Sequence, residues 1–317
     1  MTFGVAEGTT SVRMGVVRGR FAPSPTGSLH LGNLRTALVA WLSARSVGGE
    51  FIVRMEDLDR VTSSRSHEID QLASLRSIGL DWDGEVVRQS ERFARYHEAI
   101  SRLPAGTVYE CYCTRREIRR AAEAPHGADP DGHYPGTCRG LTVQQRRALR
   151  ESGRRPALRL HSDDGDESFD DRFCGPQTGR VDDLVLQRND GVPAYNLAVV
   201  VDDAAQGVTE VVRADDLLPS TAGQIRLHRL LDLPIPAYAH LPLAVAPDGT
   251  RLAKRHGAVT LSDLAGRGLS PGDVCAWLAA SLGIDTDGRP VMAPELLDRF
   301  DLALLPRAPW RLSPDEL

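Results

Sequence analysis

The segment RFAPSPTGSLHLGNLR at positions 20–35 constrains the fold of this chain more than any other. Two prolines and a glycine within it exclude regular structure, so a turn must follow the short strand predicted at 16–21. From Asn33 onward, apolar residues recur at helical spacing until a glycine pair, which predicts a helix. The turn therefore brings His30, Gly32 and the free backbone amides of a helix N-terminus to one point, an arrangement that suits a phosphate group.

Strands and helices continue to alternate after this helix. The apolar triplet at 51–53 indicates a buried strand, and helical spacing returns at 66–78 and 91–103. Such alternation predicts an α/β fold with a parallel sheet. Strand patterns return at three later segments, 184–187, 197–201 and 207–212. The middle one, LAVVV, is apolar throughout, so we expect it to be a central strand.

Residues 109–180 break this alternation. They contain two closely spaced cysteines, a Gly/Pro/His-rich stretch at 124–136, an arginine-rich helix and an acidic stretch at 163–171 that we expect to be a loop. This segment is interpreted as an insertion. The expected division of the chain is 16–105 and 191–240 for the two halves of the α/β domain, 106–190 for the insertion, and 241–317 for a loop followed by a helical C-terminal region.

Composition places the chain among ordinary folded proteins, because 41% of its 317 residues are hydrophobic and 26% are charged. No stretch approaches the roughly 18 apolar residues of a membrane-spanning helix, and residues 1–15 lack the pattern of a signal peptide. We therefore expect a cytoplasmic protein. Its five cysteines, with Cys111 and Cys113 separated by one residue, favour a metal site over a disulfide framework. Cys174 and Cys275 are expected to be packing residues.

Positive charge is distributed unevenly. Arginines crowd the segment 115–159, although the formal net charge of the chain is -5. On charge alone we favour a solvated surface whose arginines pair with three glutamates, Glu117, Glu123 and Glu151. The alternative interpretation is a surface that binds nucleic-acid phosphates.

Lysine is nearly absent, since Lys254 is the one lysine among 38 basic residues. A chain that uses arginine wherever a positive charge serves retains lysine where a compact, flexible ammonium is needed. Lys254 is therefore a candidate site residue, with chance retention as the alternative.

Five blocks of sequence resemble one enzyme family. His30-Leu31-Gly32-Asn33 is similar to the first signature of the class I aminoacyl-tRNA synthetases, and the preceding RFAPSPTG resembles the glutamyl and glutaminyl branch. Further blocks agree in order: VRMEDLDR at 53–60, YNLAVVVDD at 195–203, GVTEVVR at 207–213 and RLAKR at 251–255. The last block is similar to the second signature of the class and contains the single lysine.

Within that branch the chain looks most like the short paralogues of glutamyl-tRNA synthetase. About sixty residues follow Lys254, too few for an anticodon-binding region, and a Cys-x-Cys segment is typical of the paralogues. The resemblance implies a Rossmann-like parallel sheet with an inserted, zinc-containing, acceptor-type subdomain and a short helical C-terminal region. It also implies ATP-dependent activation of L-glutamate to glutamyl-adenylate, then transfer of glutamate to the queuosine at the wobble position of tRNA(Asp).

The resemblance assigns roles to individual residues. For glutamate these are Arg20, Ala22, Ser24, Glu56, Tyr195 and Arg213. For ATP, with Mg²⁺, they are Pro23, Thr26, His30, Gly32, Asn33 and Lys254, of which His30 and Lys254 are implied to be catalytic. Bidentate arginines suit the two carboxylates of glutamate, and a protein carboxylate suits its ammonium group. The alternative to ligand binding is a purely structural ion pair: Arg213 with Asp215 or Asp216, and Glu56 with Arg54 or Arg60.

The implied metal ligands are Cys111, Cys113, Tyr134 and Cys138, around one structural zinc ion. Imidazole is a commoner zinc ligand than phenolate, so the frequency of each ligand type favours His133. We expect Tyr134 because it keeps three residues before the last cysteine, as in the family.

Expected partners are queuosine-containing tRNA(Asp), L-glutamate and ATP, with no membrane, and the protein is expected to be a monomer. Two other functions stay open: a truncated enzyme that charges the 3' end of tRNA(Glu), and a non-catalytic tRNA-binding regulator. The short C-terminal region speaks against the first. The joint presence of His30, Glu56, Tyr195, Arg213 and Lys254 speaks against the second.

Overall fold

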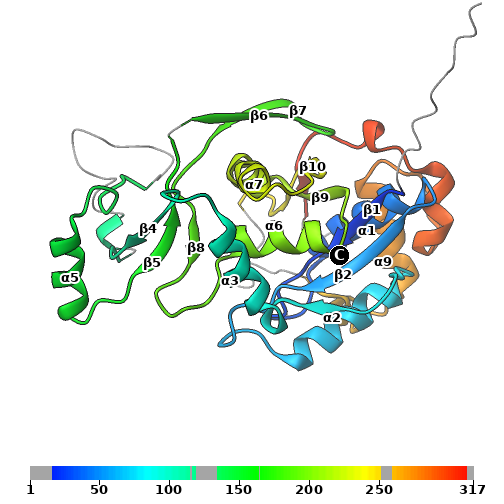
Figure 1. Cartoon of the computed structure of the whole chain (residues 1–317). Helices are drawn as coiled ribbons and strands as arrows, with labels where there is room; N and C mark the ends of the chain where they lie inside the picture. The colour runs from blue at the N-terminus through cyan, green and yellow to red at the C-terminus, as the bar shows by residue number, and fades with distance from the viewer. Residues whose placement is uncertain (1–15, 115, 119–133, 164, 251–258, 313–317) are drawn as a thin grey trace, which may run out of the picture.

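The structure is a computed structural model that describes residues 16–312 except 115, 119–133, 164 and 251–258. Figure 1 shows the parallel strands and their helices at one end of the molecule and a smaller antiparallel sheet at the other. A long hairpin runs between the two ends. None of the helices in the described residues is long and apolar enough to span a membrane.

The first third of the chain forms the α/β pattern that the sequence predicts. Its elements are β1 (Arg18–Phe21), α1 (Leu31–Arg45), β2 (Glu50–Met55), α2 (Arg65–Ser77), β3 (Val87–Arg88), η1 (Gln89–Glu91) and α3 (Phe93–Arg102). Strands β1, β2 and β3 are parallel. Helix α1 is buried along most of its length because the apolar core surrounds it, with Leu34, Leu38 and Leu42 fully enclosed. The predicted parallel sheet is confirmed.

A second group of elements forms its own ladder of strands, which lies beside β1. It comprises α6 (Tyr195–Ala205), β9 (Glu210–Ala214), η2 (Asp215–Leu217), α7 (Leu218–Leu230) and β10 (Ala237–Leu241). The amide of Thr209, just before β9, donates to the carbonyl oxygen of Arg18, and β9 and β10 are parallel. Strand order therefore reverses beside β1. In open α/β sheets such a reversal creates a crevice at the carboxyl ends of the strands, where ligands bind.

The prediction of a central strand at 197–201 is wrong, because this segment lies within helix α6. A short apolar run fits a strand or a buried helix equally well, and only its continuation separates the two. Here the helix continues through Asp202 and Asp203, whose carboxylates are buried and paired with arginines. Its apolar residues pack in one core with α3 and α7, so nearly every face of α6 is covered.

The middle segment forms the antiparallel sheet and the hairpin. It contains β4 (Val108–Cys111), α5 (Val143–Glu151), β5 (Ala157–Leu160), β6 (Asp166–Asp171), β7 (Gly175–Arg180) and β8 (Val185–Gln187). Strands β4, β5 and β8 pair with one another, whereas β6 also pairs with β10 of the parallel sheet. The acidic loop expected at 163–171 is thus mostly strand β6. Alternate acidic residues of β6 are buried: Glu167 binds Arg226 and Arg229 of α7, which compensates the charge.

The C-terminal region packs against α1. Its elements are β11 (Ala244–Val245), α8 (Leu261–Ala265), α9 (Pro271–Ser281), η4 (Ala293–Arg299), η5 (Leu302–Leu304) and β12 (Trp310–Arg311). Cys275 is fully buried on α9, as expected for a packing residue. Cys174 is exposed instead, because it lies in the tight turn between β6 and β7.

Candidate active site

The carboxyl ends of three parallel strands bring the predicted glutamate-binding residues together. Arg20 lies near the end of β1, Glu56 directly follows β2, and Arg213 lies near the end of β9. Tyr195 is the first residue of α6, and the charges of all three residues act on its hydroxyl. Burial, followed by the negative charge of Glu56, raises the pKa of Tyr195, so its hydroxyl remains a hydrogen-bond donor.

Glu56 shares its site with a buried arginine. The guanidinium of Arg54 is fully enclosed and donates to the carboxylates of Asp203, at 2.7 Å, and Glu56, at 3.3 Å. The ion pair between Arg54 and Glu56, which we considered as an alternative to function, is therefore present. Burial raises the pKa of Glu56 and Arg54 opposes that shift. Because Glu56 also lines an open cleft, its carboxylate is available to a ligand while it pairs with Arg54.

Arg20 is buried with few partners of its own. Its Nη1 donates to the carbonyl oxygen of Val212 at 3.0 Å, and its Nε lies 3.7 Å from Asp203. That Nε has no hydrogen-bond acceptor among the described residues. Burial lowers the pKa of Arg20, an effect that Asp203 opposes. A buried cation with an unused donor is suited to an anionic ligand.

Arg213 makes no ion pair with any described carboxylate, so the alternative pairing with Asp215 or Asp216 is absent. All of its acceptors are neutral: Nε donates to Nε2 of His240 at 2.9 Å, Nη1 to Gln224 at 2.9 Å, and Nη2 to Thr221 at 2.8 Å and the Leu217 carbonyl at 3.5 Å. The residue is only 4% exposed. Its positive charge is thus buried without a directly bound anion, which favours binding of a negatively charged ligand.

The residues that hold Arg213 are absent from the sequence-based predictions. His240 and Thr221 are fully buried, and Gln224 nearly so. Gln224 is itself oriented by donating to Asn196 at 2.9 Å. The signal that could have revealed His240 is a single histidine within the apolar strand segment AYAHL, where a buried imidazole needs polar partners.

The predicted phosphate corner lies at the start of α1. His30 is the residue that caps this helix: its Nδ1 accepts from the amide of Asn33 at 3.3 Å, and the Asn33 side chain accepts from the amide of His30. A Cβ on Gly32 would lie 3.1 Å from the His30 ring and from Ala244, so a larger residue would crowd this corner. The amide of Leu31 donates to Val259. The amides of Leu31 and Asn33 thus already donate within the protein, so fewer backbone amides at this helix N-terminus remain for a phosphate than the sequence predicts.

The loop before this corner follows the end of β2. The amide of Glu56 donates to the carbonyl oxygen of Pro23 at 2.9 Å, and that of Thr26 to Ser24 at 2.8 Å. Ala22 is half-buried, whereas Ser24 and Thr26 are exposed. This arrangement joins the predicted glutamate-binding and ATP-binding residues in one region. Lys254 lies outside the described residues.

One open cleft of about 1260 Å³ connects this region with the middle segment. Ser24, Glu56 and Tyr195 line one part of it, and Cys111 and Cys113 line another. Four arginines also contribute to its walls: Arg154, Arg155, Arg159 and Arg188. The cleft therefore extends from the parallel sheet to the antiparallel sheet, and its lining combines arginines, which suit phosphates, with the carboxylates of Asp59, Asp182 and Asp183.

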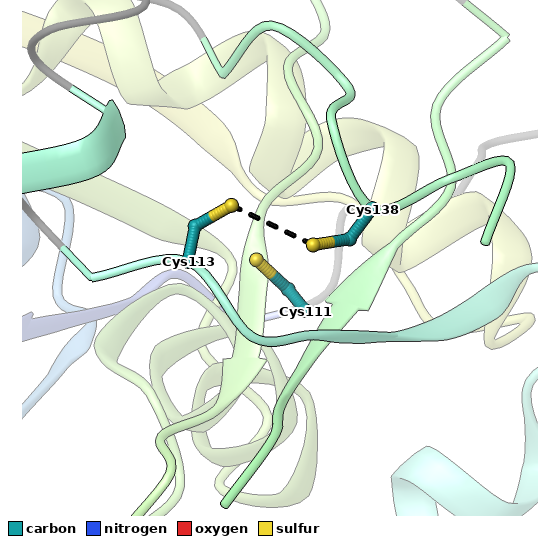
Figure 2. A group of neighbouring side chains, drawn as sticks. All are labelled: Cys111, Cys113 and Cys138. Carbon is teal, nitrogen blue, oxygen red and sulfur yellow. Dashed lines mark hydrogen bonds between the residues drawn. The ribbon is translucent and has the colours of Figure 1, made fainter. Parts of the chain in front are cut away.

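Three cysteine thiols meet beside this cleft (Figure 2). The Sγ atoms of Cys111, Cys113 and Cys138 all lie within 4.8 Å of one another. The hydroxyl oxygen of Tyr134 lies 3.3 Å from Sγ of Cys111 and 3.5 Å from Sγ of Cys113. A tetrahedral zinc ion bound at about 2.3 Å from thiolates separates its ligand atoms by about 3.8 Å. The four side chains fit such an ion, whereas His133 lies outside the described residues.

Several arginines of the middle segment pair with acids, as charge alone predicts. Arg147 pairs with Glu151 on α5, and Arg154 pairs with Glu117. Glu123 lies outside the described residues. Arg155 is exposed, lines the cleft and makes no ion pair with a described carboxylate. The segment thus combines paired arginines with at least one that lines the cleft and has no carboxylate partner among the described residues.

A parallel sheet that reverses its order beside a His-x-Gly helix N-terminus defines the catalytic fold of a class I tRNA synthetase. The family described as "tRNA synthetases class I (E and Q), catalytic domain" matches residues 16–293. The chain therefore belongs to this family, whose members are aminoacyl-tRNA synthetase ligases.

Individual relatives fall into two named groups. The chain is 59% identical to the glutamyl-Q tRNA(Asp) synthetase of Nocardia farcinica, with 94% of each chain covered. It is 50% identical to the protein of that name from Symbiobacterium thermophilum, with 94% of this chain and 97% of the relative covered. It is 39% identical to the glutamate–tRNA ligase of Geobacter sulfurreducens, but covers only 65% of that protein.

A solved structure agrees with the fold. The glutamate-tRNA synthetase of Elizabethkingia anophelis superposes with a TM-score of 0.78 at 28% identity. The match covers 95% of this chain and 69% of that structure.

Proposed function

We propose that this protein activates L-glutamate with ATP and transfers the glutamate to queuosine in tRNA(Asp). The observation that carries the proposal is the buried guanidinium of Arg213, which has only neutral acceptors and lies in one site with Arg20, Glu56 and Tyr195. Two relatives that match this chain over nearly their whole length are named for the same activity, which supports the choice of nucleic-acid substrate.

Glutamate fits the charges of this site. Arg20 and Arg213 neutralise its two carboxylates, Glu56 binds its ammonium group, and the hydroxyl of Tyr195 donates a hydrogen bond. We also assign Ala22 and Ser24, which follow Arg20 closely along the chain, to the glutamate site. Glutamine would place a neutral amide against one guanidinium, and that mismatch costs on the order of 1–3 kcal/mol.

Activation requires stabilisation of negative charge more than proton transfer. An oxygen of the α-carboxylate of glutamate attacks the α-phosphorus of ATP, and the bond from that phosphorus to the pyrophosphate oxygen breaks. We assign the binding of ATP, with Mg²⁺, to Pro23, Thr26, His30, Gly32, Asn33 and Lys254. Among these, His30 and Lys254 stabilise the charge that develops on the phosphates. A nucleophile of the queuosine base then attacks the carbonyl carbon of the adenylate, and AMP leaves.

The middle segment receives the tRNA in this proposal. Arginines that line the cleft hold phosphates without reading the base sequence. One structural zinc ion, held by Cys111, Cys113, Tyr134 and Cys138, connects β4 to the residues before α5 and so shapes the wall of the cleft. The proposed domain division remains 16–105 and 191–240 for the catalytic domain, 106–190 for the insertion and 241–317 for the C-terminal region.

The test uses labelled glutamate, ATP and purified tRNAs with and without queuosine. We expect label on queuosine-containing tRNA(Asp), and we expect ribonuclease digestion at mildly acidic pH to leave it on the anticodon-loop fragment and not on the 3' terminal adenosine. Labelled glutamine serves as the matched control and should give no product. Labelling of unmodified tRNA(Glu), with the label released on the 3' terminal adenosine by the same digestion, would instead show a truncated enzyme that charges the tRNA 3' end.

A further inference from the structure

Asp171, His240 and Arg213 form a row across three neighbouring strands. The order of these strands is β6, β10 and β9, and His240 is the register partner of Arg213. The three side chains are 3%, 0% and 4% exposed, respectively. Arg20 lies next to this row, because its Nη1 donates to the carbonyl oxygen of Val212, the residue before Arg213. Along the chain, 69 residues separate Asp171 from His240.

The hydrogen bonds fix the direction of each donor in this row. Oδ1 of Asp171 accepts from the backbone amides of Phe173 at 3.0 Å, Cys174 at 2.7 Å and His240 at 3.1 Å. Oδ2 lies 2.6 Å from Nδ1 of His240. An ionised carboxylate only accepts hydrogen bonds, so the proton between these two atoms belongs to Nδ1 of the imidazole.

The other ring nitrogen is then an acceptor. In neutral histidine with Nδ1 protonated, Nε2 carries the lone pair. This Nε2 accepts from the Nε–H of Arg213 at 2.9 Å, and the hydroxyl oxygen of Thr221 lies 3.1 Å from it. The opposite tautomer would place an N–H against the guanidinium. Burial lowers the pKa of His240, an effect that Asp171 opposes and Arg213 reinforces, so the ring stays neutral.

We propose that Asp171 and His240 are positioning residues for Arg213. Asp171 holds His240 in the Nδ1–H tautomer, and Nε2 of His240 holds the guanidinium in the direction in which it binds a carboxylate of the amino-acid substrate. This inference rests on the proposed function, because it takes glutamate as the ligand of Arg213. It also means that the hairpin of the middle segment, through Asp171 on β6, contributes to recognition of the amino acid.

Three substitutions test whether Asp171 and His240 orient the guanidinium of Arg213 or only stabilise the fold. In Asp171→Asn, the single amide oxygen is held by three backbone amides, so the NH₂ group faces Nδ1 of His240 and forces the Nε2–H tautomer. In His240→Gln, the amide oxygen reaches the position of Nε2 and still accepts from Arg213. In His240→Asn, the side chain reaches only the position of Nδ1 and leaves Arg213 without this acceptor. Asp170→Asn, an exposed neighbour on β6, is the matched control.

The first measurement is glutamate-dependent ATP–pyrophosphate exchange by the full chain, with queuosine-containing tRNA(Asp) present. We expect Asp171→Asn and His240→Asn to raise the KM for glutamate by about tenfold to a hundredfold, with the KM for ATP unchanged. His240→Gln and Asp170→Asn should remain within about threefold of the parent, as expected when the acceptor is retained. Equal KM values for His240→Gln and His240→Asn would overturn the proposal, even if Asp171→Asn failed to fold.

The second measurement is nitrogen-15 NMR of the histidine rings, with the His240→Gln variant used to identify the His240 signals. We expect the Nδ1–H tautomer in the parent and the Nε2–H tautomer in Asp171→Asn. An Nε2–H tautomer in the parent would overturn the positioning role whatever the activity. Absence of any glutamate-dependent exchange by the parent would instead refute the proposed function, and with it the substrate that this row is proposed to recognise.

Discussion

Two buried arginines show how neighbours decide the role of a residue. Burial alone would lower the pKa of Arg54, but the adjacent Asp203, Glu56 and Asp202 raise it, so this guanidinium balances carboxylates of the protein. Arg213 has only neutral acceptors and remains ready for an external anion. The sequence predicted Arg213 as a site residue but could not show which arginine already had carboxylate partners, because those partners come from distant segments.

At the same scale, the single lysine leads to the first prediction. Replacing Lys254 with arginine preserves the charge but substitutes a rigid, planar group for a compact ammonium that follows the moving phosphates. We expect ATP–pyrophosphate exchange to fall by about a hundredfold or more, which corresponds to about 3 kcal/mol of activation free energy. Arg255→Lys, the converse change at the next residue, is the control and should retain most activity. Exchange near the parental rate in Lys254→Arg would contradict the role assigned to this residue.

A buried histidine predicts how stability depends on pH. Burial lowers the pKa of His228 on α7 to about 4. The unfolded chain binds a proton at this residue below about pH 6.5, whereas the folded chain does so only near pH 4, so the free energy of unfolding falls as the pH falls through this interval.

The expected effect appears in the difference between two proteins. Between about pH 7 and pH 5, the parent should lose about 2 kcal/mol more unfolding free energy than His228→Gln, as measured by urea denaturation. His97 is exposed, so His97→Gln should behave like the parent. Identical pH dependence in the parent and His228→Gln would contradict the prediction, because it would show that folding does not change the pKa of this histidine.

Elements in the first third of the chain were predictable because their signals are local. Turn residues, caps and helical spacing identified β1, α1, β2, α2 and α3 to within a few residues. Helix α6 was assigned wrongly, since its apolar run is too short to reveal a period and its two aspartates are satisfied only by arginines from other segments. Strand β6 was predicted as a loop because it is acidic, and the arginines that compensate its buried Glu167 come from helix α7. A local sequence pattern therefore predicts a helix or strand well when its polar residues do not depend on ion pairs with distant segments.

The metal prediction concerns the last residue of β4, Cys111, and the residues between β4 and α5. We expect one zinc ion per chain, and we expect Tyr134→Phe to weaken zinc binding by about tenfold or more because one ligand atom is lost. His133→Ala should bind zinc as the parent does. Competition with a chelator measures both affinities. The ligand set would be refuted by metal analysis that finds no zinc, or by loss of zinc in His133→Ala but not in Tyr134→Phe.

For the whole molecule, the relation between two distant regions could not be predicted from the sequence. The arginine-rich segment and the signature motifs were each visible, but the cleft that joins them depends on how the antiparallel sheet is placed against the parallel one. The β6–β7 hairpin contributes to that placement, since β6 pairs with β10. A chain with a formal net charge of -5 thereby presents arginines along the route to its active site.

This distribution of charge predicts the salt dependence of transfer to tRNA. Each phosphate contact releases counterions, so the logarithm of kcat/KM for the tRNA should fall linearly with the logarithm of salt concentration, by about 0.7 in slope for each contact. Arg155 lines the cleft without a described carboxylate partner, and Arg155→Gln should therefore make the slope shallower by about that amount. Arg289→Gln removes the same charge from an exposed arginine that pairs with Asp287 outside the cleft, and should leave the slope unchanged. Rates of glutamate transfer between about 50 and about 200 mM salt, at saturating ATP and glutamate, provide the comparison. If both variants changed the slope equally, the net charge of the protein, and not the cleft, would govern its attraction for tRNA.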